Sequence, residues 1–310
     1  MFQVEILVSK INSKKFDKIK IMKSILTKIL NSIYKYKQGL SIVGIIFLLF
    51  SINFVSHYVY NSVILNDAPA ELENSEYSDC NVQGILLRGD IYTYIPTDLD
   101  GYPLEGYEGA VSSEEISYLI GEAEYDDNIK AILIEVDSYG GSPLAGEEIS
   151  NDIKFATKPV VVYIRESGVS AAYLAISSAD QIFASKMSDV GSIGVTMSYL
   201  DYSTQNRQEG ISFVQLSTGK FKDSGSPDKS ITQEEKNLFM RDLNIIQDIF
   251  IRSVSENRNI SIEKVESIAD GSSVLGEQAI ELDLIDQIGD YYSAGDYISE
   301  LIGEEVNDCW

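Results

Sequence analysis

Residues 159–176 read PVVVYIRESGVSAAYLAI, from Pro159 to Ile176. The opening apolar run, Pro159 to Ile164, predicts a buried strand, and the small-residue run from Ala171 to Ile176 predicts a helix. The chain then repeats the alternation, with a second strand predicted at residues 181–184 and a glycine turn at residues 191–194. Strands and helices alternating at this length predict βαβ units with right-handed crossovers, and therefore an α/β fold.

Ser170 stands where the predicted strand gives way to the predicted helix. A hydroxyl there lies at the carboxyl edge of the sheet, beside backbone N–H groups of the first helical turn that have no helical partner. Those groups stabilise negative charge, which favours a nucleophilic role for the serine. Serine is also a preferred helix N-cap, so this pattern alone leaves both interpretations open.

Further elements are predicted on both sides of this stretch. Ser112 with Glu115, and Thr232 with Glu235, have capping-box spacing and mark helix starts. The second of these helices is predicted to run to about Asn257. Apolar patterning predicts strands at 84–87 and 90–95 (as a pair), 131–136 and 211–216, and helices at 144–155, 200–208, 262–268, 276–282 and 292–301.

Charge is distributed very unevenly along the 310 residues, whose formal net charge is −24. Residues 1–38 hold nine lysines against Glu5 and Asp17, a net charge of +7. Residues 61–310 hold 15 basic and 46 acidic residues, a net charge of −31. So acidic a domain argues against nucleic acid as a partner.

The two charged parts are separated by Leu40–Tyr60, 21 residues without Lys, Arg, Asp or Glu. In a helix they would cover about 30 Å, the thickness of a bilayer core. The lysines before the run predict that the N-terminus is cytoplasmic. A cleaved signal peptide, with a small-x-small site at Ala68-Pro69-Ala70, and a buried core helix are the alternatives, and both fit the length and charge step less well.

Cys80 and Cys309 both fall on the outer side of this predicted span. Outside the cytoplasm they could pair and tie the ends of the domain together. Two free thiols are an equally open interpretation.

The chain has a single histidine, His57, at the edge of the predicted membrane span. The acidic domain therefore cannot hold a Ser-His-Asp triad, a Cys-His pair or a histidine-rich zinc site. A serine nucleophile there would need another base, and lysine serves when its environment lowers its pKa. Lys220 and Lys222 are candidates in a loop after a predicted strand, although two ordinary solvated lysines are the simpler interpretation of that loop.

Four segments, taken in order, resemble the signal peptide peptidase A family of membrane-anchored bacterial Ser–Lys proteases. They are Asp137-Ser138-Tyr139-Gly140-Gly141-Ser142, Val169-Ser170-Ala171-Ala172-Tyr173, Gly191-Ser192-Ile193-Gly194-Val195 and Gly219-Lys220-Phe221-Lys222-Asp223. The resemblance runs from about residue 82 to residue 290. It implies the fold of the Clp-protease and crotonase superfamily, with repeated ββα units, preceded here by one transmembrane helix.

The resemblance also assigns roles to individual residues. Ser170 matches the nucleophile and Lys222 the general base, whereas Lys220 matches a neighbour without that role. Ser192 matches a serine that orients the lysine amine. The N–H groups of Gly141 and Ala171 would form the oxyanion hole, with Gly140 shaping the turn. No metal or other cofactor is implied.

This sequence departs from the family pattern at two places. Tyr139 stands where the family commonly has proline before the two glycines, and Ala171-Ala172 stand where it commonly has two glycines after the nucleophile. Alanine keeps its N–H, so neither change removes a reacting group. Both leave substrate preference open.

The predicted organisation follows from these observations. It comprises a basic cytoplasmic tail (1–38), a transmembrane helix (39–60), a linker (61–80), a Ser–Lys protease domain (81–303) and a C-terminal tail (304–310). By the resemblance, the domain would lie on the extracytoplasmic side of the cell membrane and cleave signal peptide remnants or other extended apolar peptides. It would assemble as a homo-oligomer with composite active sites.

Two other function classes fit the same fold. One is a crotonase-like acyl-CoA enzyme, although few basic residues are available for a CoA phosphate and such enzymes usually lack a membrane anchor. The other is a catalytically silent membrane scaffold, which would have no need of Ser170 or Lys222. Reaction with a serine-directed probe separates the three hypotheses.

Overall fold

The computed structural model describes residues 80–98 and 100–310, together with Ser24, Thr27 and Lys28, which are helical and exposed. The chain divides into two units, residues 1–75 and 76–310. Apart from these three positions and Cys80, the predicted tail, membrane span and linker, with His57, lie outside the described residues. Among the residues that are described, no helix combines the length and the hydropathy needed to cross a bilayer.

A parallel sheet forms the centre of the second unit, with strand order β2-β1-β3-β4-β5-β8. β6 runs parallel to β4 beyond the end of β5 and pairs antiparallel with β7. β9 adds to β1. The strands are β1 (Val82–Tyr92), β2 (Val111–Ser112), β3 (Ala131–Gly141), β4 (Val160–Val169), β5 (Gln181–Ala184), β6 (Asp189–Gly191), β7 (Ser273–Leu275), β8 (Gln287–Ile288) and β9 (Asp308–Cys309).

Helices connect the strands, so the predicted α/β class is confirmed. Ser112 caps α3 by accepting from the Glu115 N–H, and Thr232 with Glu235 forms a complete capping box at α7. The helices are α3 (Ser113–Tyr125), α4 (Pro143–Phe155), α5 (Ala171–Ile176), α6 (Ser203–Gln208), α7 (Gln233–Arg258), α8 (Ile262–Ile268), α9 (Gly276–Glu281) and α10 (Tyr291–Ile302).

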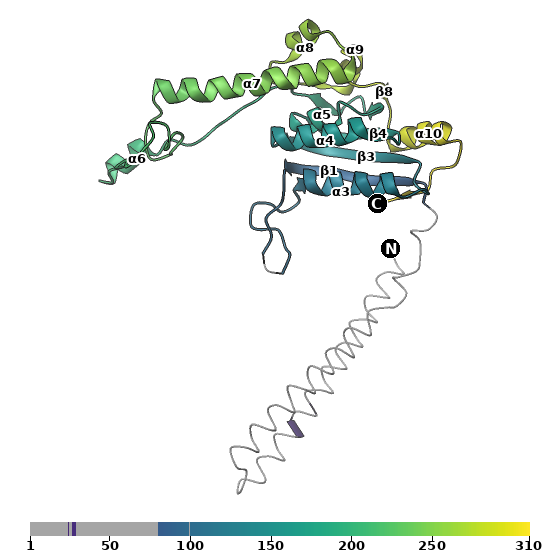
Figure 1. The fold of residues 1–310 in the computed structure, drawn as a ribbon, viewed down its shortest axis with the longest axis horizontal. Helices are drawn as coiled ribbons and strands as arrows, with labels where there is room; N and C mark the ends of the chain where they lie inside the picture. The colour runs from purple at the N-terminus through teal and green to yellow at the C-terminus, as the bar shows by residue number, and fades with distance from the viewer. Residues whose placement is uncertain (1–23, 25–26, 29–79, 99) are drawn as a thin grey trace. The chain divides into compact units, whose positions relative to one another are not determined.

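The two faces of the sheet carry separate hydrophobic clusters. Ile132, Ile134 and Val136 of β3 point into the larger cluster, together with residues of α3, α4, α5 and α7. Their neighbours Ala131 and Leu133 point into the smaller cluster, which α10 covers. This alternation follows from the period of two along a strand. Figure 1 shows α3, α4 and α5 stacked along the sheet and α10 at its far end.

β1 corrects the predicted pair of strands at residues 84–87 and 90–95. The structure has one continuous strand, and its pairing with β3 shifts register between Arg88 and Asp90. Gly89 lies between them with a φ of 72°, and a Cβ there would collide with the Gly109 carbonyl. Gly89, which in the sequence suggested a turn between two strands, therefore marks a β-bulge within one strand.

The prediction of a strand at residues 211–216 is wrong for the single chain. These residues belong to no β-ladder in the part of the chain that the structure describes. Their apolar side chains are exposed, so the pattern that predicted a strand has no neighbour to pair with. In Figure 1 this segment belongs to residues 195–232, here called the arm, which carry α6 away from the sheet.

The C-terminal residues join the sheet. β9 pairs with the start of β1, and Cys309 forms a disulfide with Cys80, their Cα atoms 6.0 Å apart. The ring of Trp310 lies so close to Gly84 that a Cβ there would overlap it. Residues 304–310, predicted to be a C-terminal tail, thus include a strand that pairs with the first strand of the domain. The two cysteines, which the sequence left as either paired or free, form a disulfide.

Candidate active site

Ser170 connects β4 to α5 in a strained backbone conformation, with φ 54° and ψ −129°. Non-glycine residues rarely adopt this region, and its cost has to be met by the surrounding structure. Ser170 occupies the N-cap position of α5, but its side chain makes no capping hydrogen bond. The simple N-cap interpretation therefore fails, because the hydroxyl does nothing for the helix that it precedes.

The surrounding structure holds this turn firmly. The Ser170 N–H donates to the Gly191 carbonyl at 2.8 Å, which ties the turn to the end of β6. Further along α5, the buried Tyr173 hydroxyl donates to the Leu284 carbonyl at 2.8 Å. Burial raises the pKa of the Tyr173 phenol far above its ordinary value, so the ring stays neutral and anchors the helix.

The glycine pair at the end of β3 approaches Ser170 closely. A Cβ on Gly140, whose φ is 102°, would lie 2.9 Å from both the Ala171 nitrogen and the Ser170 Cβ. The Gly140 N–H donates to the Ser138 hydroxyl at 3.0 Å, and the Ser142 N–H donates to Ile91 of β1 at 2.8 Å. Since successive N–H groups of a strand alternate in direction, that of Gly141 is expected to point the other way, toward the Ser170 turn.

A cavity of about 270 Å³ opens at Ser170. Its walls come from the first turns of α4, from α5, from the segment after β6 and from the second half of α7. Its lining is mostly apolar: Ser142, Pro143, Leu144, Glu147, Ser170, Ala171, Leu174, Gly194, Val195, Ile246, Ile249 and Phe250. The sequence had predicted the helix that becomes α7 without linking it to the site, and no sequence signal marked Glu147.

Ser192 lies next to this site and has a positive φ of 49°. Its hydroxyl donates to the Gly271 carbonyl at 2.7 Å. The same loop is held from α7 by Gln247, whose Nε2 donates to the Ala269 carbonyl at 3.1 Å. Ser192 is therefore ordered beside the Ser170 turn, with the loop of residues 269–271 as its partner.

Lys222 is not among the residues that line the Ser170 cavity. The turn that contains Lys222 packs on the start of α7, where a Cβ on Gly225 would lie 3.4 Å from the Phe239 ring. Ile246, the nearest cavity-lining residue of α7, is seven residues further on, which is about 10 Å along the helix axis. In the described part of the chain, the exposed Lys222 amine has no hydrogen-bond or ion-pair partner.

Lys220, two residues earlier, differs in this respect. Its amine forms an ion pair with Glu234 at 2.6 Å, on the first turn of α7. The structure thus distinguishes the two lysines, because the Lys220 amine is paired with Glu234 while the Lys222 amine has no partner among the described residues.

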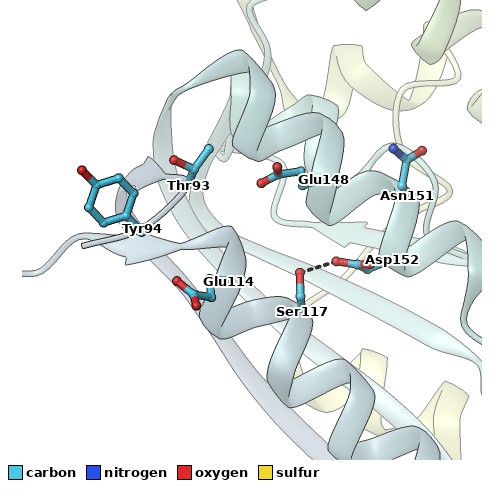
Figure 2. Close-up of a pocket in the computed structure, with 7 residues that line it drawn as sticks. All are labelled: Thr93, Tyr94, Glu114, Ser117, Glu148, Asn151 and Asp152. Carbon is cyan, nitrogen blue, oxygen red and sulfur yellow. Dashed lines mark hydrogen bonds between the residues drawn. The ribbon is translucent and has the colours of Figure 1, made fainter. Parts of the chain in front are cut away.

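A second cavity, of about 550 Å³, lies between the end of β1 and the helices α3 and α4. Figure 2 shows three acidic side chains around it, Glu114, Glu148 and Asp152, with the Ser117 hydroxyl donating to Asp152. None of the site residues predicted from the sequence lines it. The two neighbouring carboxylates of α4 therefore line different cavities. Glu147 lines the cavity at Ser170, and Glu148 lines this second cavity.

Comparison with known families and proteins adds an independent line of evidence. The profile of peptidase family S49 matches residues 152–303. A protein of Methanocaldococcus jannaschii named as a protease is 38% identical over 173 residues, covering 55% of this chain and 56% of that protein. A protein of Enterococcus faecium named as the signal peptide peptidase SppA is 32% identical over 167 residues, covering 53% of this chain and 48% of that protein.

The chain thus spans about half the length of these two curated relatives. Among solved structures, a ClpP1 variant from Listeria monocytogenes superposes with a TM-score of 0.44 at 16% identity, covering 68% of this chain and 93% of that one. The matched family profile contains Ser170, Ser192 and Lys222, and begins after the Gly140-Gly141 pair.

Proposed function

We propose that this chain is a serine endopeptidase whose nucleophile is Ser170, because residues 152–303 match the profile of peptidase family S49. The observation that carries the proposal is the Ser170 turn itself. A strained serine with no capping hydrogen bond stands at the mouth of an apolar cavity. Strain of this kind is retained where it positions a reacting group.

The chemistry proposed is acyl transfer in two steps. The Ser170 Oγ attacks the scissile carbonyl and its proton passes to a base, while the Gly141 and Ala171 N–H groups receive the developing oxyanion. The base then protonates the leaving amine as the C–N bond breaks. Water, deprotonated by the same base, attacks the ester, and Ser170 recovers its proton as the acid product leaves.

Lys222 is the base in this proposal, and it comes from a neighbouring copy of the chain. The first support for a composite site is that Lys222 does not line the Ser170 cavity of its own chain. The second is that its amine is unpartnered in the described residues. A third is that the arm exposes Ile211, Phe213, Val214 and Leu216 on an extended segment without a strand partner. Such a segment fits addition to another copy. Ser192 would orient the incoming amine.

The proposed substrates are signal peptides released into the membrane, or other extended apolar peptides. The apolar lining of the cavity supports this class. The proposed location is the extracytoplasmic side of the cell membrane, with residues 39–60 as a single-pass anchor. The Cys80–Cys309 disulfide is consistent with an oxidising compartment. Protease added to intact spheroplasts should digest the domain and spare the lysine-rich tail, and a protected domain would refute this topology.

The nucleophile is tested by labelling the detergent-solubilised full-length chain with a fluorophosphonate probe and mapping the modified residue. We expect modification at Ser170 and its loss in Ser170→Ala. Ser178→Ala is a matched control on the same connection, because the Ser178 hydroxyl is already engaged with Ser150. Labelling that persists in Ser170→Ala, or maps to another serine, would refute the assignment.

A further inference from the structure

Glu147 is the one titratable group among the side chains that line the Ser170 cavity. It lies on α4 one helical turn after Leu144, so the two side chains share a face of the helix. The buried side chains of Leu174 and Phe250 also line the cavity. A carboxylate therefore stands on one wall of a cavity that is otherwise apolar apart from serine hydroxyls.

No other group in the described residues uses this carboxylate. Glu147 is exposed and makes neither a hydrogen bond nor an ion pair there. Its neighbour Glu148 differs, because it accepts a hydrogen bond from the Ser113 hydroxyl at 2.5 Å and lines the second cavity. Glu147 has no visible part in holding the fold.

The size of the cavity limits what can enter it. At about 270 Å³ it is smaller than the pockets that enclose whole drug-sized ligands, which begin at roughly 300 Å³. It suits one side chain of an extended peptide whose backbone passes Ser170. A side chain that fills it displaces water from around Glu147, and a carboxylate that loses water without gaining a partner costs free energy.

A lysine or arginine side chain can fill the cavity and also pair with the Glu147 carboxylate, which avoids this desolvation cost. Each has an apolar stem that can lie against Leu174 and Phe250, and a cationic end that can reach a carboxylate at the cavity wall. A glutamate or aspartate in the same place would add a like charge to the desolvation cost. The cavity thus combines an apolar surface for the stem with a counter-charge for the end.

We infer that Glu147 is a specificity-determining residue, which makes the Ser170 cavity select a lysine or arginine side chain of the bound peptide. The inference rests on the proposed function for its substrate class, since it takes the ligand to be an extended peptide. It adds that among such peptides those with a basic residue at the position entering the cavity bind best, and those with an acidic residue bind worst.

The test measures binding, so that it does not depend on catalysis. Full-length Ser170→Ala in mild detergent is titrated with fluorescent leucine- and alanine-rich nonapeptides, in which one lysine is moved along the sequence. Norleucine and glutamate replace the lysine in matched sets. At one position we expect lysine to bind about fivefold tighter than norleucine, a modest ion-pair contribution. The advantage should shrink as salt is raised.

Glu147→Gln added to this protein should abolish the lysine advantage, and Glu147→Lys should transfer it to the glutamate peptide. Glu148→Gln is the matched control and should leave the advantage unchanged. Equal binding of the lysine and norleucine peptides at every position, a preference that survives Glu147→Gln, or no binding of any peptide would overturn the inference. If the lysine preference depends on Glu147 but the fluorophosphonate probe does not label Ser170 in the wild-type chain, the inference stands and the proposed nucleophile is refuted.

Discussion

The sheet around Ser170 and the arm of residues 195–232 are both rich in apolar residues, yet only one of them buries them. Val161 and Val162 of β4 are 0% exposed, whereas Val214 and Leu216 of the arm are 75% and 92% exposed. The strand obtains hydrogen bonds from β3 and β5, and the arm segment belongs to no ladder in the described residues. The single chain thus buries the apolar side chains of its sheet and leaves those of its arm exposed, and the proposed composite site is what would cover them.

The largest effect expected from this comparison is on turnover. Lys222→Arg keeps the positive charge of the arm but cannot accept a proton from serine, so peptide hydrolysis should fall by roughly a thousandfold. Lys220→Arg should be nearly silent, because arginine can keep the ion pair with Glu234. Steady-state rates on one fluorogenic peptide measure both. A silent Lys222→Arg beside an inactive Lys220→Arg would mean that the two lysines have been assigned in reverse.

The sequence predicted the sheet far better than the arm, for physical reasons. The strands β3, β4 and β5 are buried, so continuous apolar runs identify them, although β4 continues to Val169 through polar residues. Strong N-terminal caps likewise located α3 and α7. At residues 211–216 the same apolar signal failed, because a strand needs a neighbour and the described part of the chain provides none.

The candidate site was predictable only in part. Ser170, Ala171 and Gly140 were indicated by the sequence and lie together in the structure. The free state of the Ser170 hydroxyl, and the absence of Lys222 from the lining of its cavity, depend on how distant segments fold back. Glu147 carried no signal, because one carboxylate on an exposed helix face looks like any solvated charge until a cavity forms beside it.

The arm should matter for assembly and not for the stability of the single chain. Leu216→Asp places a charge on a side chain that is already exposed, so the chain should fold normally while association weakens by roughly tenfold or more. Tyr125→Asp, at the exposed end of α3, is the control and should leave assembly unchanged. Mass photometry across a dilution series reads the outcome. Unaltered assembly of Leu216→Asp would remove the arm from the interface.

The Ser170 turn should be sensitive to its glycine neighbour. Gly140→Ala combines a positive φ with a Cβ 2.9 Å from Ser170, so unfolding should become easier by about 2 kcal/mol or more. Gly106→Ala has a φ of 92° but open space around it, and should cost only about 1 kcal/mol. Urea denaturation compares them. Equal losses would show that the close approach at Ser170 is not important for stability.

The smallest effect concerns Glu235, at the joint between the arm and α7. The hydrogen bond from Lys229 and the Thr232 backbone N–H lower the pKa of its carboxyl from 4.5 to about 2. Because the folded-state pKa is depressed, this carboxylate stabilises the fold fully above pH 4.5 and loses that contribution as the pH falls toward 2. Glu235→Gln should therefore be less stable by about 1 kcal/mol above pH 4.5.

Chemical denaturation of the two proteins between pH 2 and pH 6 measures this difference. The unfolding free energies of the wild-type chain and Glu235→Gln should converge as the pH approaches 2. A gap that stays constant over the whole range would mean that the charge on Glu235 is not what stabilises the joint.

Complementation between two inactive variants tests the composite site most directly. Ser170→Ala and Lys222→Ala should each be inactive alone. After subunit exchange in equal amounts, random assembly places an intact serine next to an intact lysine in about a quarter of the sites, so about a quarter of the wild-type activity should return. A mixture that remains inactive, with exchange demonstrated by differently labelled subunits, would contradict a base supplied by the neighbouring chain.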